Sequence, residues 1–512
     1  MGKGFGAATS SNRSSQAADR FFDRAVEALG RSDQTGALLA LRAALAAQPT
    51  HVPSLNELGA VMLSNGDATE ALGCFERALP VATDAQRPQV LNNLACALLE
   101  LQRPEAALER LDLALTLLPD HAQARCQRGV TLQALGRLPE AQQQLEQAVQ
   151  ANPSDPKALV NLALVHQELD QLQAALASAK RAFERAPNDH NIRWLLATLL
   201  LASGRAPQAW PLFESRLFAD NAIGLYAYPD LPAWNPSSEP PPPTLLLVAE
   251  QGLGDCLMWL RFLPLLRPMC QRIELCGPAS LQPLLGGLQL VDACLTPETL
   301  EQSTAQRFLP LLSLGLAVPD LLGQAAACLA ALHYQPPKRS LDHWRSLRDA
   351  TPETLLVGVH WQGNPMAEGR SHLRGRSMPL AALRPLQQLP NCQWVSLQYG
   401  AGEEQITAAD RRQWFVPWQD QVDQAPSLED RAALLRACDL LVTTDSMVAH
   451  LAGLVGTPTL LLLHHCPEWR WREGACPGLY PTHTILRQRS AGDWQPVVAD
   501  AAARIGQWPR RA

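Results

Sequence analysis

The chain has 512 residues, 47% of them hydrophobic, and its 43 basic and 49 acidic residues leave a net charge of −6. A chain of this length is too long for a single hydrophobic core, so several domains are expected. The mildly acidic balance argues against a nucleic-acid partner, because such binding requires a basic surface.

The twelve cysteines are scattered singly, without any C-x-x-C pair. This usage is typical of reduced thiols in a reducing compartment. The N-terminus has no apolar segment of the kind found in secretory signals, and no apolar run approaches the roughly 20 residues of a membrane-spanning helix. These features predict a cytoplasmic protein without a transmembrane segment.

The first part of the chain is repetitive. Pro119, Pro153 and Pro187 recur every 34 residues, each after an alanine-rich amphipathic stretch. Small residues such as Gly59 recur where two helices would cross closely, and glycines such as Gly66 recur at the turns between helices. A period near 34 residues is typical of stacked helix pairs, so we predict an α-solenoid of about six repeats.

The predicted array occupies residues 17–219, after a flexible tail at residues 1–16. Its pattern resembles the tetratricopeptide repeat family, whose members bind proteins along a concave face. That resemblance implies a protein partner for the array, while a purely spacing or dimerising role remains an alternative.

A proline-rich connector follows at residues 220–243 and ends in four consecutive prolines, Pro240 to Pro243. Consecutive prolines force an extended backbone and stop any helix. We therefore predict a domain boundary here.

Two strand-turn-helix units lie in the second half, at residues 244–264 and 439–463. Between them the pattern predicts a strand at residues 355–360, a helix at 380–389, a strand at 393–397 and a helix at 428–437. Alternating strands and helices indicate a mostly parallel sheet. We predict one α/β lobe at residues 244–338 and another at residues 339–512.

The turn of the second unit carries Asp445 and Ser446, followed by His450 on the same face of the helix. We expect Ser446 to cap this helix, whose free N–H groups and dipole would then face an anion such as a diphosphate. The alternative is an ordinary helix start with a core histidine.

Five motifs in the second half resemble one enzyme family. They are E-Q-G-L-G-D at residues 250–255, V-H-W-Q-G-N-P at 359–365, R-S-M-P-L at 376–380, V-S-L-Q at 395–398 and D-S-M-V-A-H-L-A-G-L-V-G-T-P at 445–458. Residues 244–494 are in this respect similar to bacterial heptosyltransferase-like glycosyltransferases, especially those fused to tetratricopeptide repeats.

The resemblance implies a GT-B fold of two Rossmann-like lobes. The N-terminal lobe would hold the acceptor, and the C-terminal lobe a nucleotide-diphosphate sugar. Transfer to a protein or saccharide would invert the configuration at the anomeric carbon. It would need no metal or other cofactor.

The resemblance also implies that Asp255 is the general base, which a buried carboxylate suits. Its alternative role is that of an acid favoured by the helix dipole. Gln251, Gly252 and Gly254 would form the acceptor loop, with glycines that admit a ligand. The residues assigned to the donor are Trp361, Asn364, Arg376, Gln398, Asp445, Ser446, His450 and Trp469.

Other interpretations of these residues remain open. Arg376 suits phosphate oxygens, whereas a solvated loop explains the nearby Arg370, His372 and Arg374 equally well. The aromatic and basic patch at residues 468–472 would line the donor side or pack against the sheet. The main rival to an enzyme is a non-catalytic scaffold with a degenerate nucleotide-binding domain.

Overall fold

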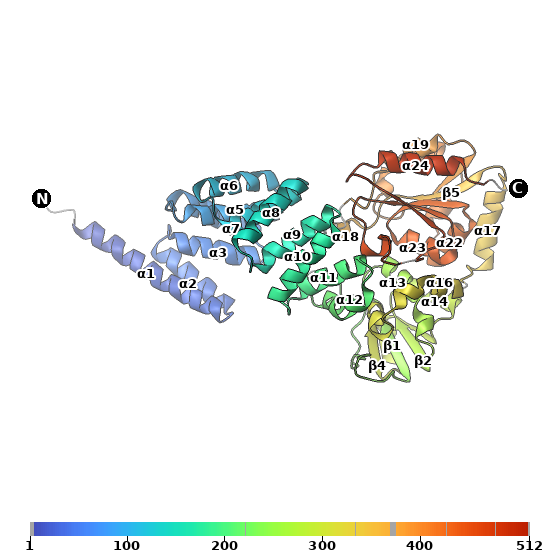
Figure 1. Ribbon diagram of the computed structural model, residues 1–512, viewed down its shortest axis with the longest axis horizontal. Helices are drawn as coiled ribbons and strands as arrows, with labels where there is room; N and C mark the ends of the chain where they lie inside the picture. The colour runs from blue at the N-terminus through green and yellow to red at the C-terminus, as the bar shows by residue number, and fades with distance from the viewer. Residues whose placement is uncertain are drawn as a thin grey trace. The chain divides into compact units, whose positions relative to one another are not determined.

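The computed structural model describes residues 5–220, 222–332, 334–368, 375–425, 427–476 and 478–509, without the side chains of residues 5–13, 331 and 367. The chain divides into two compact units, Met1–Leu169 and Asp170–Ala512. Figure 1 shows the helices and strands of both units.

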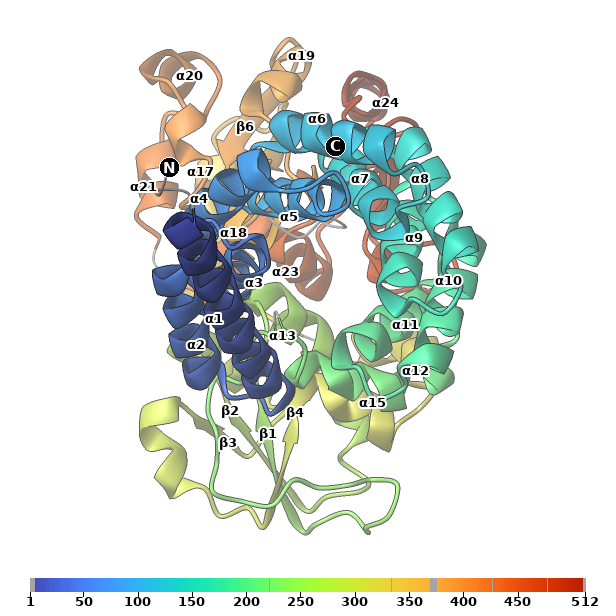
Figure 2. The same cartoon turned by 90° about the vertical axis from the view of Figure 1, so that its left-hand side faces the viewer.

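The first unit is helical, and its helices pack in consecutive pairs, α1 on α2, α3 on α4, α5 on α6 and α7 on α8 (Figure 2). The helices are α1 (Phe5–Gly30), α2 (Gln34–Ala47), α3 (Val52–Ser64), α4 (Ala68–Ala78), α5 (Arg87–Glu100), α6 (Pro104–Leu117), α7 (Ala122–Ala134), α8 (Leu138–Ala151) and α9 (Pro156–Glu168). The repeating helix pairs confirm the predicted solenoid architecture. Helix α1 begins within the segment for which the sequence predicts a tail.

The small residues of the repeat are required by helix crossing. A Cβ atom on Gly59 would lie 2.5 Å from the ring of Phe75, and one on Gly129 would lie 2.5 Å from Leu145 Cγ. A larger side chain at either position would separate the paired helices, because packed interiors leave no room for extra atoms.

The turn within each repeat uses a left-handed residue. Gly66, Gly136 and Gly204 have φ values of 84°, 73° and 72°, as glycine permits. Gln102 and Asp170 take the same conformation, with φ values of 58° and 60°. The turn geometry is therefore kept even where the sequence has no glycine.

The second unit begins with helices that belong to the predicted array, α10 (Leu172–Arg185), α11 (His190–Ala202) and α12 (Ala206–Phe213). Trp210 in α12 donates a hydrogen bond from Nε1 to the backbone oxygen of Pro319 at 2.8 Å. Its ring lies edge-on to Trp259, with the centroids 5.7 Å apart. These contacts join the last helices of the array to the α/β region.

The connector also packs on the α/β region. Trp234 is buried, and its backbone N–H donates to the oxygen of Phe308 at 2.8 Å. The helical part thus ends at Leu217, before the four prolines, and the connector is packed rather than free.

Two parallel sheets form the rest of the unit, with strand orders β3-β2-β1-β4 and β6-β5-β7-β8-β9. The strands are β1 (Thr244–Val248), β2 (Arg272–Cys276), β3 (Ala293–Leu295), β4 (Arg307–Pro310), β5 (Leu355–His360), β6 (Cys392–Ser396), β7 (Leu440–Thr444), β8 (Thr459–Leu463) and β9 (His483–Arg487). The central strands are apolar because parallel sheets are covered on both faces. The predicted parallel α/β architecture is confirmed.

The helices around the sheets are α13 (Leu253–Leu260), α14 (Gln282–Leu288), α15 (Leu314–Ala317), α16 (Ala325–Ala331), α17 (Lys338–Asp349), α18 (Pro365–Glu368), α19 (Arg384–Gln387), α20 (Ala408–Gln413), α21 (Gln419–Asp423), α22 (Leu428–Ala437), α23 (Met447–Val455) and α24 (Gln495–Gly506). Residues 380–389, expected to form one helix, are instead split into a 3₁₀ turn (Leu380–Leu383) and α19. Pro385 lacks the N–H that would continue a helix across this point.

No single helix among the described residues has the length and apolar character to cross a bilayer. A pair bent by 104°, Leu311–Ala317 with Leu321–Ala330, meets those two criteria only when taken together.

Candidate active site

The loop between β1 and α13 holds Asp255 in place. Gln251 adopts a left-handed backbone with a φ of 62°, an uncommon conformation for a residue other than glycine. Gly252 forms the N-cap of α13, and its N–H donates to Asp255 Oδ2 at 3.3 Å. Asp255 Oδ1 accepts a hydrogen bond from Arg470 Nη2 at 2.6 Å. Both carboxylate oxygens of the predicted base therefore have partners.

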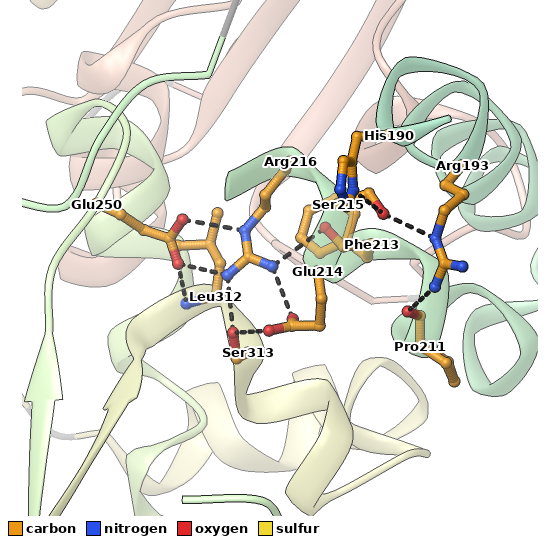
Figure 3. A network of polar contacts seen from close by, with 10 residues as sticks. All are labelled: His190, Arg193, Pro211, Phe213, Glu214, Ser215, Arg216, Glu250, Leu312 and Ser313. Carbon is orange, nitrogen blue, oxygen red and sulfur yellow. Dashed lines mark hydrogen bonds and ion pairs between the residues drawn. The ribbon is translucent and has the colours of Figure 1, made fainter. Parts of the chain in front are cut away.

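Glu250 stands at the start of this loop and is fixed by a network of polar contacts (Figure 3). Its side chain is 0% exposed and pairs with the equally buried Arg216, which donates from Nε at 3.0 Å and from Nη2 at 2.6 Å. The backbone N–H of Leu312 donates to the same carboxylate at 3.1 Å. A buried ion pair requires such additional hydrogen bonds to offset desolvation.

Arg216 lies in the 3₁₀ turn Glu214–Leu217, directly after α12. It also donates to Glu214 Oε1 at 2.7 Å and to Ser313 Oγ at 2.8 Å (Figure 3). The segment that closes the repeat array is thus bonded to the loop that carries Asp255. This link could not be predicted from the sequence, because an acid and an arginine in separate motifs give no pairing signal.

The turn between β7 and α23 differs from the prediction. Ser446 stands at the N-cap position, but its hydroxyl makes no capping hydrogen bond. The hydroxyl lies 3.2 Å from His360 Nδ1 and 3.3 Å from Thr443 Oγ1 instead. The prediction that Ser446 caps this helix is wrong, because two buried neighbours engage the hydroxyl.

Asp445, one residue earlier, is only 4% exposed. Its Oδ2 atom is buried and has no hydrogen-bond partner among the described residues. Since a buried carboxylate oxygen without a donor is costly, it marks a place where a ligand hydroxyl would be stabilised.

His450 lies in the first turns of α23 within an aromatic cluster. Its Nδ1 atom is 2.8 Å from the hydroxyl of Tyr480, and its ring stacks on Trp471 with the centroids 5.2 Å apart. Burial, together with the charges of Arg470 and Arg261, lowers the pKa of His450 well below its usual range. The imidazole is therefore neutral at physiological pH.

The two helix starts meet directly. Helix α13 packs on α23. A Cβ atom on Gly254 would lie 3.0 Å from His450 Cδ2 and 3.3 Å from Met447 Cα. Glycine is the residue that permits this approach, which brings the Asp255 loop and His450 to one place.

Two arginines add positive charge to this junction. Arg376 pairs with Glu368 at 3.7 Å, and its charge also contributes to the lowered pKa of His450. The Nε atoms of Arg376 and Arg470 are buried without a hydrogen-bond partner among the described residues. Arg370, His372 and Arg374, the other basic residues of the predicted loop, lie outside the described residues.

The remaining predicted donor residues have structural contacts. Trp361 is 0% exposed within the core of the second sheet. Gln398 is buried, accepts from the N–H groups of Trp361 and Gln362 at 3.1 Å, and donates to the oxygen of Gln362 at 2.8 Å. These contacts hold the loops after β5 and β6 together, so we assign neither side chain to a ligand.

Asn364 and Trp469 are placed differently. Asn364 is exposed and accepts from the N–H of Met366 at 3.0 Å, at the start of α18. Trp469 is buried, and the guanidinium of Arg470 lies 5.0 Å from its ring centroid. Trp469 thus positions Arg470 rather than presenting a free ring face.

A cavity of about 470 Å³ lies beside the aromatic cluster, and its lining includes Arg470, Trp471, Tyr480 and His483. Cavities of this size accommodate small ligands. Within the described residues, no group of three or more His, Cys, Asp or Glu side chains is arranged to hold a metal ion.

Comparison with known proteins supports the repeat assignment. The tetratricopeptide repeat family matches residues 52–120, 92–156, 126–177 and 160–222. This stretch of the chain therefore consists of tetratricopeptide repeats.

One curated relative extends across most of the chain. Protein FlbA of Caulobacter vibrioides is 26% identical over 499 residues, which cover 92% of this chain and 81% of the relative.

Two solved structures are each similar to part of the chain. A thermophilic tetratricopeptide repeat protein of Thermus thermophilus is 24% identical, covering 36% of this chain and 100% of that one with a TM-score of 0.34. Pseudomonas aeruginosa pilF is 20% identical, covering 39% of this chain and 90% of that one, also with a TM-score of 0.34.

Proposed function

We propose that the α/β region is a glycosyltransferase of the GT-B type, which transfers a sugar from a nucleotide-diphosphate donor to a protein or saccharide acceptor. The observation that carries the proposal is the junction of α13 and α23. There Asp255 pairs with Arg470, and the loop that carries Asp255 meets His450, a neutral histidine that also feels the charge of Arg376.

Asp255 takes the acceptor's proton in this proposal. As the hydroxyl proton passes to the carboxylate, the acceptor oxygen forms a bond to the anomeric carbon. The bond from that carbon to the diphosphate breaks, and its electron pair stays on the departing diphosphate oxygen. Attack opposite the leaving group inverts the configuration at the anomeric carbon. The proton goes to Asp255 and the negative charge to the diphosphate, so the proposed step needs no metal.

Groups of the second sheet stabilise the departing diphosphate. Arg376 and Arg470 supply positive charge with unused N–H groups, and the start of α23 supplies backbone N–H groups and the positive end of its dipole. Donors arranged before the reaction stabilise charge that develops in the transition state. Asp445 Oδ2 would accept a hydrogen bond from a hydroxyl of the donor sugar.

The tetratricopeptide repeats recruit a protein in this proposal, either the acceptor or a partner that presents it. Such repeats form extended concave surfaces suited to protein binding. The bond between Arg216 and Glu250 connects the end of the array to the loop of the base.

The test is a thermal-shift screen of UDP-, GDP- and ADP-sugars on the full chain, followed by measurement of nucleoside diphosphate release. A ligand at 100 times its dissociation constant raises the free energy of unfolding by about 2.7 kcal/mol. Stabilisation by one donor with release that depends on Asp255 would support the enzyme. If no donor stabilised the protein, the proposal would be rejected.

A specific observation favours the rival, a non-catalytic scaffold. Asp255 is held by Gly252 and Arg470, as expected of an acid with a purely structural role. In that case a donor nucleotide would bind, but no sugar would be transferred to any acceptor and no diphosphate released.

A further inference from the structure

Tyr480 is a buried polar group that the proposed chemistry does not use. Its side chain is 5% exposed, and its hydroxyl lies 2.8 Å from His450 Nδ1. Since a hydroxyl can donate or accept, the direction of this hydrogen bond decides which nitrogen of His450 carries the proton.

The surroundings of Tyr480 fix that direction. The guanidinium of Arg261 lies over the Tyr480 ring, with its carbon 4.1 Å from the ring centroid. Among the described residues, His450 Nδ1 is the one hydrogen-bond partner of the Tyr480 hydroxyl. A buried hydroxyl that only accepted would leave its own proton without an acceptor, so the Tyr480 hydroxyl donates to His450 Nδ1.

The hydroxyl also keeps its proton. Burial raises the pKa of Tyr480 to about 12, even though the charges of Arg261 and Arg470 oppose this rise. His450 is neutral because burial and the same two arginines lower its pKa. A neutral imidazole carries one proton, and if Nδ1 accepts a hydrogen bond that proton is on Nε2.

The Nε2 side of the ring faces the other helix start. Cδ2, the atom bonded to Nε2, is the one that a Cβ on Gly254 would approach to 3.0 Å. None of the described residues forms a hydrogen bond with Nε2.

We propose that Tyr480, held by Arg261, is a positioning residue that fixes His450 as the tautomer with its proton on Nε2, so that His450 offers an N–H donor to an anionic oxygen at the junction of α13 and α23. The nature of that oxygen, the diphosphate of a nucleotide, rests on the proposed function. The tautomer does not.

The first experiment measures the tautomer in the full chain, without ligand, by NMR on protein labelled with ¹⁵N-histidine. The His450→Gln variant identifies the signal. Nitrogen shifts of a neutral ring protonated on Nε2 are expected, and Tyr480→Phe should convert the signal to a mixture of both tautomers. Protonation on Nδ1 in the unaltered protein would overturn the proposal.

Tyr334→Phe is the matched control. The Tyr334 hydroxyl is also buried, but has no hydrogen-bond partner among the described residues. Its removal is expected to leave the His450 signal unchanged. A change equal to that of Tyr480→Phe would show that loss of any buried hydroxyl suffices, and would also overturn the proposal.

The second experiment titrates UDP, GDP and ADP by calorimetry. Tyr480→Phe should weaken binding of the preferred nucleotide about tenfold, on the scale of one hydrogen bond to a charged group, while Tyr334→Phe leaves it unchanged. Equal affinity in the two variants would overturn the role in binding. If the unaltered protein binds no nucleotide, the proposed function fails and the tautomer result stands by itself.

If Tyr480→Phe does not fold, two changes at His450 test the same point. The amide nitrogen of Gln reaches the position of Nε2, whereas that of Asn reaches only the position of Nδ1. His450→Gln is therefore expected to bind the nucleotide more tightly than His450→Asn, and the reverse order would contradict the proposal.

Discussion

The two strand-turn-helix units, residues 244–264 and 439–463, have similar sequence patterns but different hydrogen bonding at the helix start. In the strand-turn-helix unit at residues 244–264, the carboxylate of Asp255 accepts a hydrogen bond from the N-cap residue Gly252, so the polar groups of this turn pair with each other. In the second, Ser446 turns away from the helix, and Asp445 keeps a buried oxygen without a partner among the described residues. A turn whose polar groups already have hydrogen-bond partners is suited to holding one side chain in place. A turn with an unpaired buried oxygen is suited to binding a ligand. This difference supports the proposal that the base lies at the first turn and that the donor binds at the second.

Loss of the Asp255 carboxylate tests the catalytic half of this comparison and has the largest expected effect. Asp255→Asn should lower the transfer rate by about 10²–10⁴ while donor affinity stays nearly unchanged, because general base catalysis contributes on that scale. Donor binding and turnover are measured on the same purified variant.

Asp430→Asn is the control for Asp255→Asn. Asp430 also lies in the first turn of a helix and bonds to its N-cap residue, Ser427, at 2.9 Å. It is expected to leave turnover unchanged. Full activity in Asp255→Asn would restrict Asp255 to a helix-terminal role, and lost donor binding would move it to the donor site.

Removal of Arg216 tests whether its ion pair with Glu250 stabilises the loop between β1 and α13. Arg216→Ala leaves Glu250 buried and uncompensated, so the free energy of unfolding should fall by about 3–5 kcal/mol. Urea denaturation measures the change. The control, Arg267→Ala, removes a partly exposed ion pair with Asp292 and should cost about 1 kcal/mol or less. Equal costs would mean that the buried network does not stabilise the loop.

Arg376→Ala tests the ligand-binding half of the comparison. Loss of a hydrogen bond to a charged group should weaken nucleoside diphosphate binding by about 1.5–3 kcal/mol. Calorimetry measures it, with Arg384→Ala as the control because Arg384 pairs with Asp410 instead. An affinity that is unchanged in Arg376→Ala rules out this contact.

The close approach of the two turns gives the smallest expected effect. Gly254→Ala places a methyl group against His450 and Met447, which should cost about 1–3 kcal/mol of stability. Gly286→Ala adds a methyl group to open space in α14 and should instead stabilise by about 0.4–1 kcal/mol. Thermal melts of both variants decide whether α13 and α23 meet as described.

Periodic features could be predicted from the sequence. The repeat of small residues predicts the helix crossings at Gly59 and Gly129, because close packing admits no larger side chain. Apolar runs predict β1, β5, β7 and β8, which are buried strands of parallel sheets. The edge strand β9 was missed because it is partly exposed, with Ile485 46% exposed, and so has no apolar run.

The site depends on contacts that are distant in sequence. The hydroxyl of Ser446 is oriented by His360, and Asp255 is paired with Arg470. Neither contact has a local pattern, so motif spacing identifies the residues without their partners. The division of the chain after Leu169 was missed for the same reason, because it results from contacts such as that of Trp210 with Trp259.

The ion pair between Arg216 and Glu250 restricts how this protein can be rebuilt by domain grafting. A chimaera joined at the four prolines would replace Arg216 together with the repeats. The carboxylate of Glu250 would then be buried without its partner in an otherwise native protein. A junction after Leu169 would keep both Arg216 and Glu250 in the fragment taken from this protein, residues 170–512. Foreign repeats should therefore be grafted within the array and not at its apparent end.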